Sequence, residues 1–259
     1  MRHKLEVDGT DLSTFGVYVS GDGTFSAAEK QYTFYDAPQR SGSILSKNYQ
    51  FADINVSYKC FIYDNFRLDT IQPWYGNMAK LRSFLMSRTG QVKIKDNYHP
   101  AEYRLGVYQG PLEPDVEPDL KAGSFTLTFR CKPQRYFKTG DIYTECDMTG
   151  TDVAFPFTNP TSFASLPTFR VYGYGRFRVT HTTTDYVDIA QHDKPFIVID
   201  GETMSCHYGD TDMSAYVSFS DNNGAWADPP KFLPGGNNVR LYANQNITEV
   251  DVWPRWWTV

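Results

Sequence analysis

The sequence predicts a mainly β protein: a β-rich N-terminal domain with one helix, over residues 1–140, and a C-terminal β-sandwich, over residues 141–259. Three observations carry this prediction. Aromatic residues make up 16% of the 259 residues, and aromatic side chains favour strands and interfaces over helices. Several segments alternate polar and apolar residues with period two, as half-buried antiparallel strands do. One segment alone has a clear helical spacing of apolar residues.

Two strands are predicted first, from their strict alternation. In "INVSYKCFIY" (54–63) one face is apolar, and Asn55, Ser57 and Lys59 begin the other; "SFTLTFRC" (124–131) has its apolar residues at odd positions. Each therefore has one apolar face. The shorter runs "QVKIKD" and "EYRLGVY", which lie between them, predict two more strands.

The single helix is predicted in "QPWYGNMAKLRSFLMSRTG". Its apolar residues recur at spacings of four, three and four, and they are Trp74, Met78, Leu81 and Leu85. This spacing puts them in one stripe, which we expect to pack on a sheet. Asn77 is the expected N-cap and Gly90 the expected stop.

The acidic, proline-rich stretch "PLEPDVEPDLKA" (111–122) predicts a loop rather than a strand, because proline removes donors from a strand ladder. Its carboxylates, at Glu113, Asp115, Glu117 and Asp119, lack the glycine turn and distal glutamate of a calcium loop. We expect a solvated hairpin tip.

The C-terminal domain is predicted from about seven short strands. They lie in "TFRVYGYG", "RFRVT", "DYVDIA", "PFIVID", "AYVSFS", "NVRLYA" and "TEVDVW". Turns are expected at "YGYGR" (172–176), "SDNNG" and "LPGGNN". This many short strands over about a hundred residues is typical of a β-sandwich.

The chain's end is expected to be docked rather than frayed. In "VDVWPRWWTV", Val250 and Val252 share one face of a strand, Asp251 and Trp253 share the other, and Pro254 ends the strand. Burial of each indole stabilises the fold by roughly 1.5–3 kcal/mol or more. Trp256 and Trp257 follow, and Arg255 is expected to stack on an indole or to pair with an acid.

Signatures of chemistry are absent from the sequence. The five histidines show no metal-ligand spacing, and no nucleophile or phosphate-loop motif occurs. We therefore expect no enzyme, no metal and no cofactor. The cysteines, predicted to be buried free thiols, are Cys60, Cys131, Cys146 and Cys206.

Charge and hydropathy limit the partners and the compartment. The net charge of −5 comes without a basic patch, which argues against specific nucleic-acid binding. No signal peptide or membrane-length apolar segment is seen, so we expect folding in the cytoplasm and no membrane insertion.

Two other functions stay open on the residues alone. A glycosidase needs two well-placed acids, and 30 acidic residues always offer such pairs. A sugar-binding β-sandwich needs an aromatic platform, whose candidate members are Trp226, Tyr172, Tyr174, Tyr208 and Tyr242.

Nearly the whole chain, in fragments of the same order, resembles the distal tail protein (Dit) family of siphophages that infect mainly Gram-positive bacteria. The fragments are "VDGTDLSTFGVYVSG", "DAPQRSGSIL", "VSYKCFIY", the helix, "FTLTFRCKPQRYFKTGD", "NPTSFASLPTFRVYGYG", "IVIDGETMSCHY", "FLPGGNNV" and "VWPRWWTV". The tract "PQRSGSIL" has fewer glycines than the family commonly carries there.

Certain residues carry this resemblance as structural motifs. The most specific is a strand expected to end at a domain border, in Cys131, Lys132, Pro133, Gln134 and Arg135. The others are Asn159 and Pro160 after a strand, and the terminal Trp253, Pro254, Arg255, Trp256 and Trp257.

The resemblance implies a structural hub at the tip of a phage tail, assembled in the host cytoplasm. Family members form a hexameric ring from their N-terminal domain, with a galectin-like C-terminal domain outside it. The ring joins the tail tube to the tail-associated lysin or spike, lets DNA pass, and in many phages carries the receptor-binding proteins. We further expect acidic groups such as those in "EPDVEPD" to face the channel or solvent, since basic groups would hold the DNA.

Overall fold

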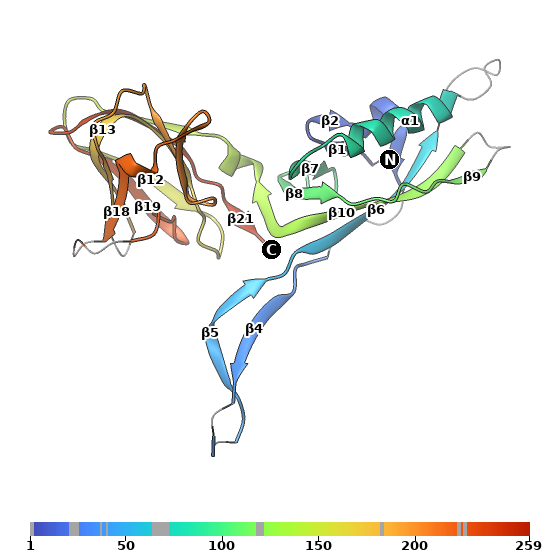
Figure 1. The fold of residues 1–259 in the computed structure, drawn as a ribbon, viewed down its shortest axis with the longest axis horizontal. Coiled ribbons are helices and arrows are strands. Elements are labelled where there is room, and N and C mark those ends of the chain that lie inside the picture. The colour runs from blue at the N-terminus through green and yellow to red at the C-terminus, as the bar shows by residue number, and fades with distance from the viewer. Residues whose placement is uncertain are drawn as a thin grey trace. The chain divides into compact units, whose positions relative to one another are not determined.

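The computed structural model describes residues 3–20, 26–36, 38–39, 41–63, 73–117, 122–181, 184–221, 224 and 227–259. Contacts between Cα atoms divide the chain into two units (Figure 1). Unit 1 comprises Met1–Arg135 and Val259, and unit 2 comprises Tyr136–Thr258. The structure confirms a mainly β protein. Among the described residues, no helix is long and apolar enough to span a membrane.

Unit 1 is built on an antiparallel sheet with the strand order β2-β1-β7-β8-β10-β6-β3, and β9 also pairs with β10. Its strands are β1 (Leu5–Val7), β2 (Thr10–Asp11), β3 (Val17–Val19), β6 (Ile54–Tyr63), β7 (Val92–Asp96), β8 (Glu102–Tyr108), β9 (Asp115–Glu117) and β10 (Ala122–Phe137). A 3-10 helix, Leu12–Phe15, separates β2 from β3.

The core of unit 1 lies between this sheet and the helix α1 (Pro73–Met86). The apolar faces predicted for β6 and β10 are buried, and the two strands pair so that Leu127 lies opposite Tyr58. The predicted helix stripe is confirmed at Met78, Leu81 and Leu85, which join the same core.

The predicted ends of the helix were wrong. The helix begins at Pro73, so Asn77 lies inside it and is not the N-cap. Proline is favoured in the first turn because its missing N–H has no helical acceptor there. The helix ends at Met86, before Gly90, whose φ of 84° instead serves the turn into β7. The side chain of Trp74 lies outside the described residues.

One prediction about proline in strands also fails. Asp115–Glu117 forms strand β9, although a loop was predicted, because its pairing with Ala122, Gly123 and Ser124 leaves Pro114 outside the ladder. The strand β10, expected to end within residues 131–135, runs through Pro133 to Phe137. The register with β6 ends at Cys131, so Pro133 removes no donor from that pair.

A two-stranded sheet of its own stands beside these elements, formed by β4 (Lys30–Tyr35) and β5 (Ile44–Phe51). We call this element the hairpin. It was not predicted as a pair of strands.

Unit 2 contains the strands predicted for the β-sandwich, arranged as two sheets that share β13. The strands are β11 (Thr144–Asp147), β12 (Val153–Asn159), β13 (Thr168–Thr180), β14 (Thr184–Ile189), β15 (Ile197–Asp200), β16 (Ser205–Tyr208), β17 (Thr211–Asp212), β18 (Val217–Asp221), β19 (Gly235–Leu241) and β20 (Asn246–Trp253). A short last strand, β21 (Trp257–Thr258), belongs to neither of these sheets. One sheet has the order β11-β20-β13-β15-β16-β17. In the other, β13 pairs with β14 and β19, which in turn pair with β18 and β12.

The predicted turn at "YGYGR" is wrong, because these residues lie inside β13. The strand passes from one sheet to the other there, with a bulge between Tyr172 and Gly173. Gly173 and Gly175 have φ of 94° and 126°, and a side chain at Gly173 would collide with the carbonyl of Asn246. The two glycines therefore bend a continuous strand instead of ending it.

Candidate functional site

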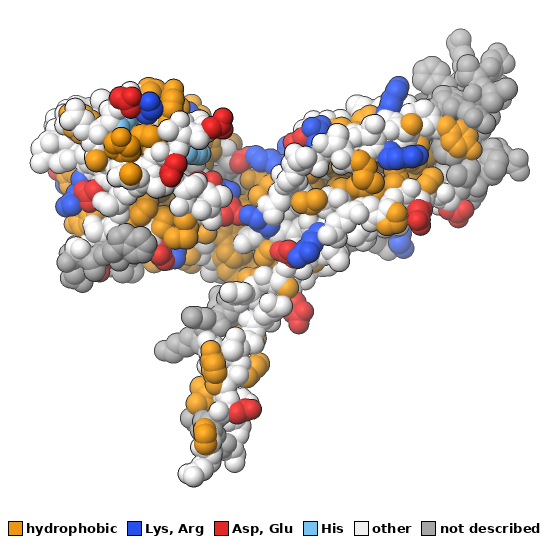
Figure 2. Space-filling model, viewed as in Figure 1, with side chains coloured by type: hydrophobic (Ala, Val, Ile, Leu, Met, Phe, Trp, Pro, Cys, Tyr) orange, Lys and Arg blue, Asp and Glu red, His pale blue; other side chains and the backbone are white. Residues whose placement is uncertain are grey.

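The hairpin presents an unusual amount of apolar surface. Every described side chain of β4 is exposed, and Phe34 is 63% exposed. The large apolar side chains exposed on the two strands, which we call the hairpin surface, are Tyr32, Phe34, Tyr35, Ile44 and Leu45. Figure 2 shows apolar side chains along this element. Two isolated strands are marginally stable in water, and contiguous exposed apolar patches mark interaction sites. The hairpin surface is therefore suited to binding another protein surface.

The sequence holds a short signal for the hairpin that the sequence analysis did not use. In "KQYTFY", Tyr32 and Phe34 alternate with polar residues. The register shifts between Tyr32 and Phe34, and the aromatic residues continue to Tyr35 on the opposite face. Large apolar side chains are usually buried in an isolated chain, so a strand with exposed apolar residues on both faces is unexpected.

The C-terminal tryptophans are docked, as predicted, and the structure places the contacts of Trp256 and Trp257 in unit 2. Trp256 belongs to the core of this unit and its ring lies 5.6 Å from that of Phe232. Trp257 stacks on Phe163 at 4.5 Å and donates its ring N–H to the carbonyl oxygen of Ala164 at 2.9 Å. Trp256 and Trp257 thus pack on the core of unit 2 and on its residues 163–164.

Arg255 fixes the backbone between these tryptophans. Its guanidinium pairs with Asp200 at 3.0 Å and with Glu202, and it donates to the hydroxyl of Thr168 at 3.2 Å. Its own φ of 54° lies in the left-handed region, a conformation that costs energy outside glycine. The prediction that Arg255 pairs with an acid is confirmed. Gly140 lies against this turn, where any side chain would collide with the backbone of Trp256.

The tract at Cys131–Arg135 brings two arginines together in unit 1. Arg135 is 3.6 Å from the carboxylate of Glu102. Arg104 donates to the carbonyl oxygens of Ser26 at 3.0 Å and of Pro133 at 3.4 Å. Burial lowers the pKa of Arg104, and the charge of Arg135 lowers it further. The tract is therefore a largely buried stretch of β10 that makes polar contacts with its neighbours. Among the described residues, it contains no reactive group.

The other members of this tract differ in exposure. Cys131 and Pro133 are buried, Lys132 is half-buried, and the side-chain oxygen of Gln134 is buried without a hydrogen-bond partner. The predicted roles of these residues as family motifs stay predictions.

Asn159 organises the loop that follows β12. Its amide group donates to the carbonyl oxygens of Phe163 at 2.9 Å and of Phe232 at 3.1 Å, and its oxygen accepts from the backbone N–H of Thr161 at 2.9 Å. The side chain is buried, so these bonds replace those it would make to water. Pro160 is exposed beside it.

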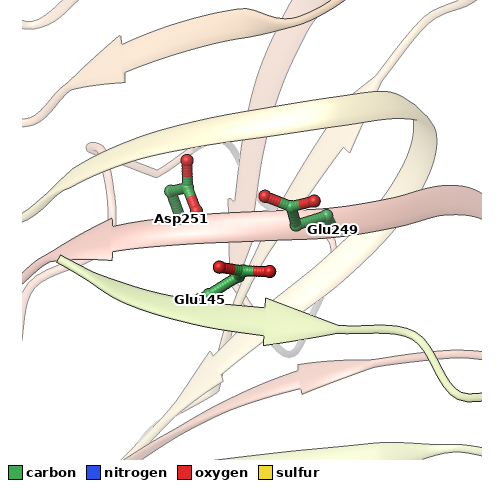
Figure 3. A group of neighbouring side chains, drawn as sticks. All are labelled: Glu145, Glu249 and Asp251. Carbon is green, nitrogen blue, oxygen red and sulfur yellow. The ribbon is translucent and has the colours of Figure 1, made fainter.

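Three carboxylates meet on β11 and β20, and we call them the acidic cluster. They are Glu145, Glu249 and Asp251, and one oxygen from each lies within 4.8 Å of the others (Figure 3). Glu145 is directly opposite Asp251 in the strand register. Burial raises the pKa of Glu249, and so do the charges of Asp251 and Glu145. No other such group lies in the described part of the chain.

One cation lies beside the acidic cluster. Arg170 is opposite Asp251 on the neighbouring strand, and the closest approach of the two groups is 3.5 Å. The guanidinium also packs over the rings of Phe196 at 5.2 Å and Trp253 at 5.0 Å. No local pattern in the sequence marks the acidic cluster, because its members come together only through strand register.

Among the described residues, the candidates for a sugar-binding platform do not lie in one place. Tyr172 and Tyr208 both contact Phe196, at 5.5 and 5.0 Å. Tyr242 instead follows β19 in the other sheet, where Arg178 and Arg240 lie over its ring. Tyr174 packs against the core, and Trp226 lies outside the described residues.

The four cysteines are buried free thiols, as predicted. Burial raises the pKa of Cys60 and Cys146 to about 12, and that of Cys131 and Cys206 to about 11. A thiol that holds its proton this strongly is a poor nucleophile and a poor metal ligand at neutral pH.

Comparisons with known proteins agree with the resemblance seen in the sequence. Neither a family model nor a curated protein matches the chain. A solved structure, the crystal structure of the SPP1 Dit protein, covers 99% of both chains with a TM-score of 0.63 at 15% identity. It is described as a paradigm of the hub adsorption apparatus in phages that infect Gram-positive bacteria. The chain has the fold of a Dit hub protein.

Two structures of the phage p2 baseplate in its activated conformation, one with Sr and one with Ca, also share this fold. They cover 97% of this chain and 96% of the matched chain, with TM-scores of 0.53 and 0.51 at 9% identity. All three similar structures are structural components of phages.

Proposed function

We propose that this protein is the hub at the distal end of a siphophage tail. Its copies form a hexameric ring that joins the tail tube to the tail-associated lysin or spike, and the ring carries the receptor-binding proteins. The observation that carries the proposal is the match in fold to a Dit protein over 99% of both chains. A likeness that spans both units supports a common architecture rather than one shared module.

The hairpin surface supports self-association in particular. Its aromatic and aliphatic side chains are large, yet they remain exposed within the single chain. Interfaces are enriched in such residues at their centres. A ring-forming subunit needs a surface of this kind beyond its own core, and an isolated carbohydrate-binding module does not.

DNA passes through the ring without being held. Glu113 and Asp115 are exposed near the end of β8 and at β9, and they would repel phosphate rather than neutralise it. In this proposal the protein has no catalytic role, because the structures it resembles are a hub protein and a baseplate, and its buried thiols hold their protons.

The proposal is tested by the mass and image of the assembled protein. Mass photometry across a concentration series, with negative-stain images, is expected to show a six-fold ring with a central hole. The tail tube protein and the lysin or spike of the same phage are added in turn, because a hub can close its ring only on assembly. Absence of any ring in every mixture, together with measurable glycan binding by the monomer, would replace the hub by the sugar-binding alternative.

A further inference from the structure

The acidic cluster has the geometry of a cation site. One oxygen from each of Glu145, Glu249 and Asp251 lies within 4.8 Å of the others. Calcium is bound by oxygens at about 2.3–2.6 Å, so two ligands on opposite sides of one ion are separated by about 4.6–5.2 Å. The three oxygens therefore fit around one ion without rearrangement of the strands. Figure 3 shows the carboxyl groups gathered where β11 and β20 run side by side.

A second observation concerns Asp251 itself. Its side chain is only 3% exposed, and its Oδ1 atom is buried without any hydrogen-bond partner among the described residues. A buried carboxylate oxygen without a hydrogen-bond donor is destabilising. Burial of such an atom beside two further carboxylates is explained if a cation is its partner.

Arg170 does not meet this need. Its contact with Asp251 is 3.5 Å long and involves Oδ2, not the unpartnered Oδ1. Its Nε atom is itself buried without a partner, and its guanidinium packs between the rings of Phe196 and Trp253. Among the described residues, one positive charge thus faces three carboxylates, and a bound cation would offset the remaining negative charge.

We propose that Glu145, Glu249 and Asp251 bind one calcium ion on the outer face of the β11–β20 pair. Asp251 supplies the buried ligand, while Glu249 and Glu145 supply ligands from the more exposed side. All the protein ligands are carboxylate oxygens, which suits a hard cation and disfavours zinc or copper. Water fills the remaining positions. The site ties the edge strand β11 to β20 and belongs to unit 2 alone.

Calcium rather than magnesium follows from the spacing. Magnesium requires oxygens at about 2.0–2.1 Å in a near-ideal octahedron, which limits opposite ligands to about 4.2 Å. Magnesium also gives up its bound water reluctantly, whereas a site made of carboxylates from two paired strands replaces several waters at once. Calcium tolerates longer and less regular coordination.

The experiment measures calcium binding by the full chain after treatment with a chelator. Thermal unfolding is followed with CaCl2, MgCl2 or chelator, and terbium luminescence excited through tryptophan reports occupancy. Trp253 lies on the same face of β20 as Asp251 and provides the sensitiser. At ten times its dissociation constant, calcium is expected to raise the Tm by roughly 3–6 °C. Terbium luminescence is expected to saturate and to fall when calcium is added.

Three variants assign the site. Asp251→Asn is expected to abolish the calcium-dependent Tm shift, and Glu145→Gln, an exposed position that leaves the fold intact, to weaken calcium binding about tenfold. In chelator, Glu145→Gln is expected to unfold at or above the wild-type Tm, since it removes repulsion. The matched control Asp210→Asn, an exposed aspartate of unit 2 outside the cluster, keeps the full response.

The proposal is overturned by any of three results. These are no saturable terbium signal and no Tm shift at 10 mM CaCl2, a calcium response that Glu145→Gln and Asp251→Asn both retain, or an equal response to magnesium. The first two remove the site, and the third removes its assignment to calcium. None of these outcomes bears on ring formation, so the hub proposal is tested separately.

Discussion

The hairpin and the C-terminal segment are both rich in aromatic residues, but they differ in the burial of those side chains. Trp256 is in the core of unit 2, whereas Phe34 is 63% exposed on the hairpin. The C-terminal segment also has specific polar partners, through Arg255 and the ring N–H of Trp257. The hairpin surface has ring contacts within its own strands, as between Tyr32 and Phe34 at 6.4 Å.

The difference separates two uses of aromatic side chains. In the C-terminal segment they stabilise the folded monomer, because their burial accompanies folding. On the hairpin they contribute little to the monomer, and their burial is left for association. The predictions below test this division, beginning with the largest expected effect.

Trp256→Ala is expected to destabilise unit 2 by about 3–5 kcal/mol, because it empties a large volume next to Phe232. Removal of residues 253–259 is expected to leave insoluble or unfolded protein. Urea unfolding followed by circular dichroism measures both effects, and Phe34→Ala on the hairpin is the control, with a change within about 0.5 kcal/mol. Normal stability of the truncated chain would show that the segment is not part of the core.

Arg255→Ala is expected to cost about 2–4 kcal/mol, because it leaves Asp200 and Glu202 close together without their cation. The Arg255 side chain is 20% exposed, which limits screening by water. Arg176→Ala is the matched control: it breaks a bidentate pair with Asp188, but its side chain is 49% exposed, so about 1 kcal/mol or less is expected. Equal losses in thermal unfolding would contradict a special role for Arg255.

Thiol labelling separates the two units. At pH 8 the native protein is expected to resist alkylation, since burial raises the pKa of Cys60 to about 12 and that of Cys206 to about 11. In Trp256→Ala, mass spectrometry is expected to find faster labelling at Cys146 and Cys206 than at Cys60 and Cys131. Uniform labelling of all four would mean that the units unfold together.

The same thiols are expected to make the free energy of unfolding decrease at high pH. In the unfolded chain a cysteine loses its proton near pH 9.0, whereas the folded chain holds that proton up to about pH 12 at Cys60. The stabilising effect of the protonated thiols is complete below pH 9 and declines as pH rises through 9 toward 12. Urea midpoints measured from pH 7 to 10 are expected to fall above pH 9, and a constant midpoint would contradict the burial of the thiols.

Local sequence patterns correctly predicted the helix and the strands that have one apolar face. The stripe of Met78, Leu81 and Leu85 and the alternation in β6 and β10 report one buried face each, and the structure has these faces. The same reasoning failed at "YGYGR", since two glycines mark either a turn or a bend within a strand. Only the pairing partners of β13 decide between the two.

The candidate sites could not be predicted from the sequence, because they too depend on contacts between distant residues. Glu145 and Asp251 are distant in sequence and meet through the register of β11 and β20. The hairpin was missed because sequence rules assign apolar residues to the interior of the same chain, whereas Phe34 and Leu45 lie opposite each other on an exposed element. Burial in an assembly leaves no mark on the sequence that distinguishes it from burial in a core.

The smallest expected change in monomer stability comes from the hairpin, and it tests the comparison most directly. Phe34→Ser combined with Leu45→Ser is expected to change the free energy of unfolding by no more than about 0.5 kcal/mol, because both side chains are already exposed. Self-association measured by sedimentation is nevertheless expected to be lost, since the same side chains supply apolar area to the interface. Ile142→Ser, which changes an apolar residue exposed to the same degree in unit 2, is expected to leave association intact. If the double variant instead unfolds at much lower urea, the hairpin stabilises the monomer and the division between the two aromatic regions is wrong.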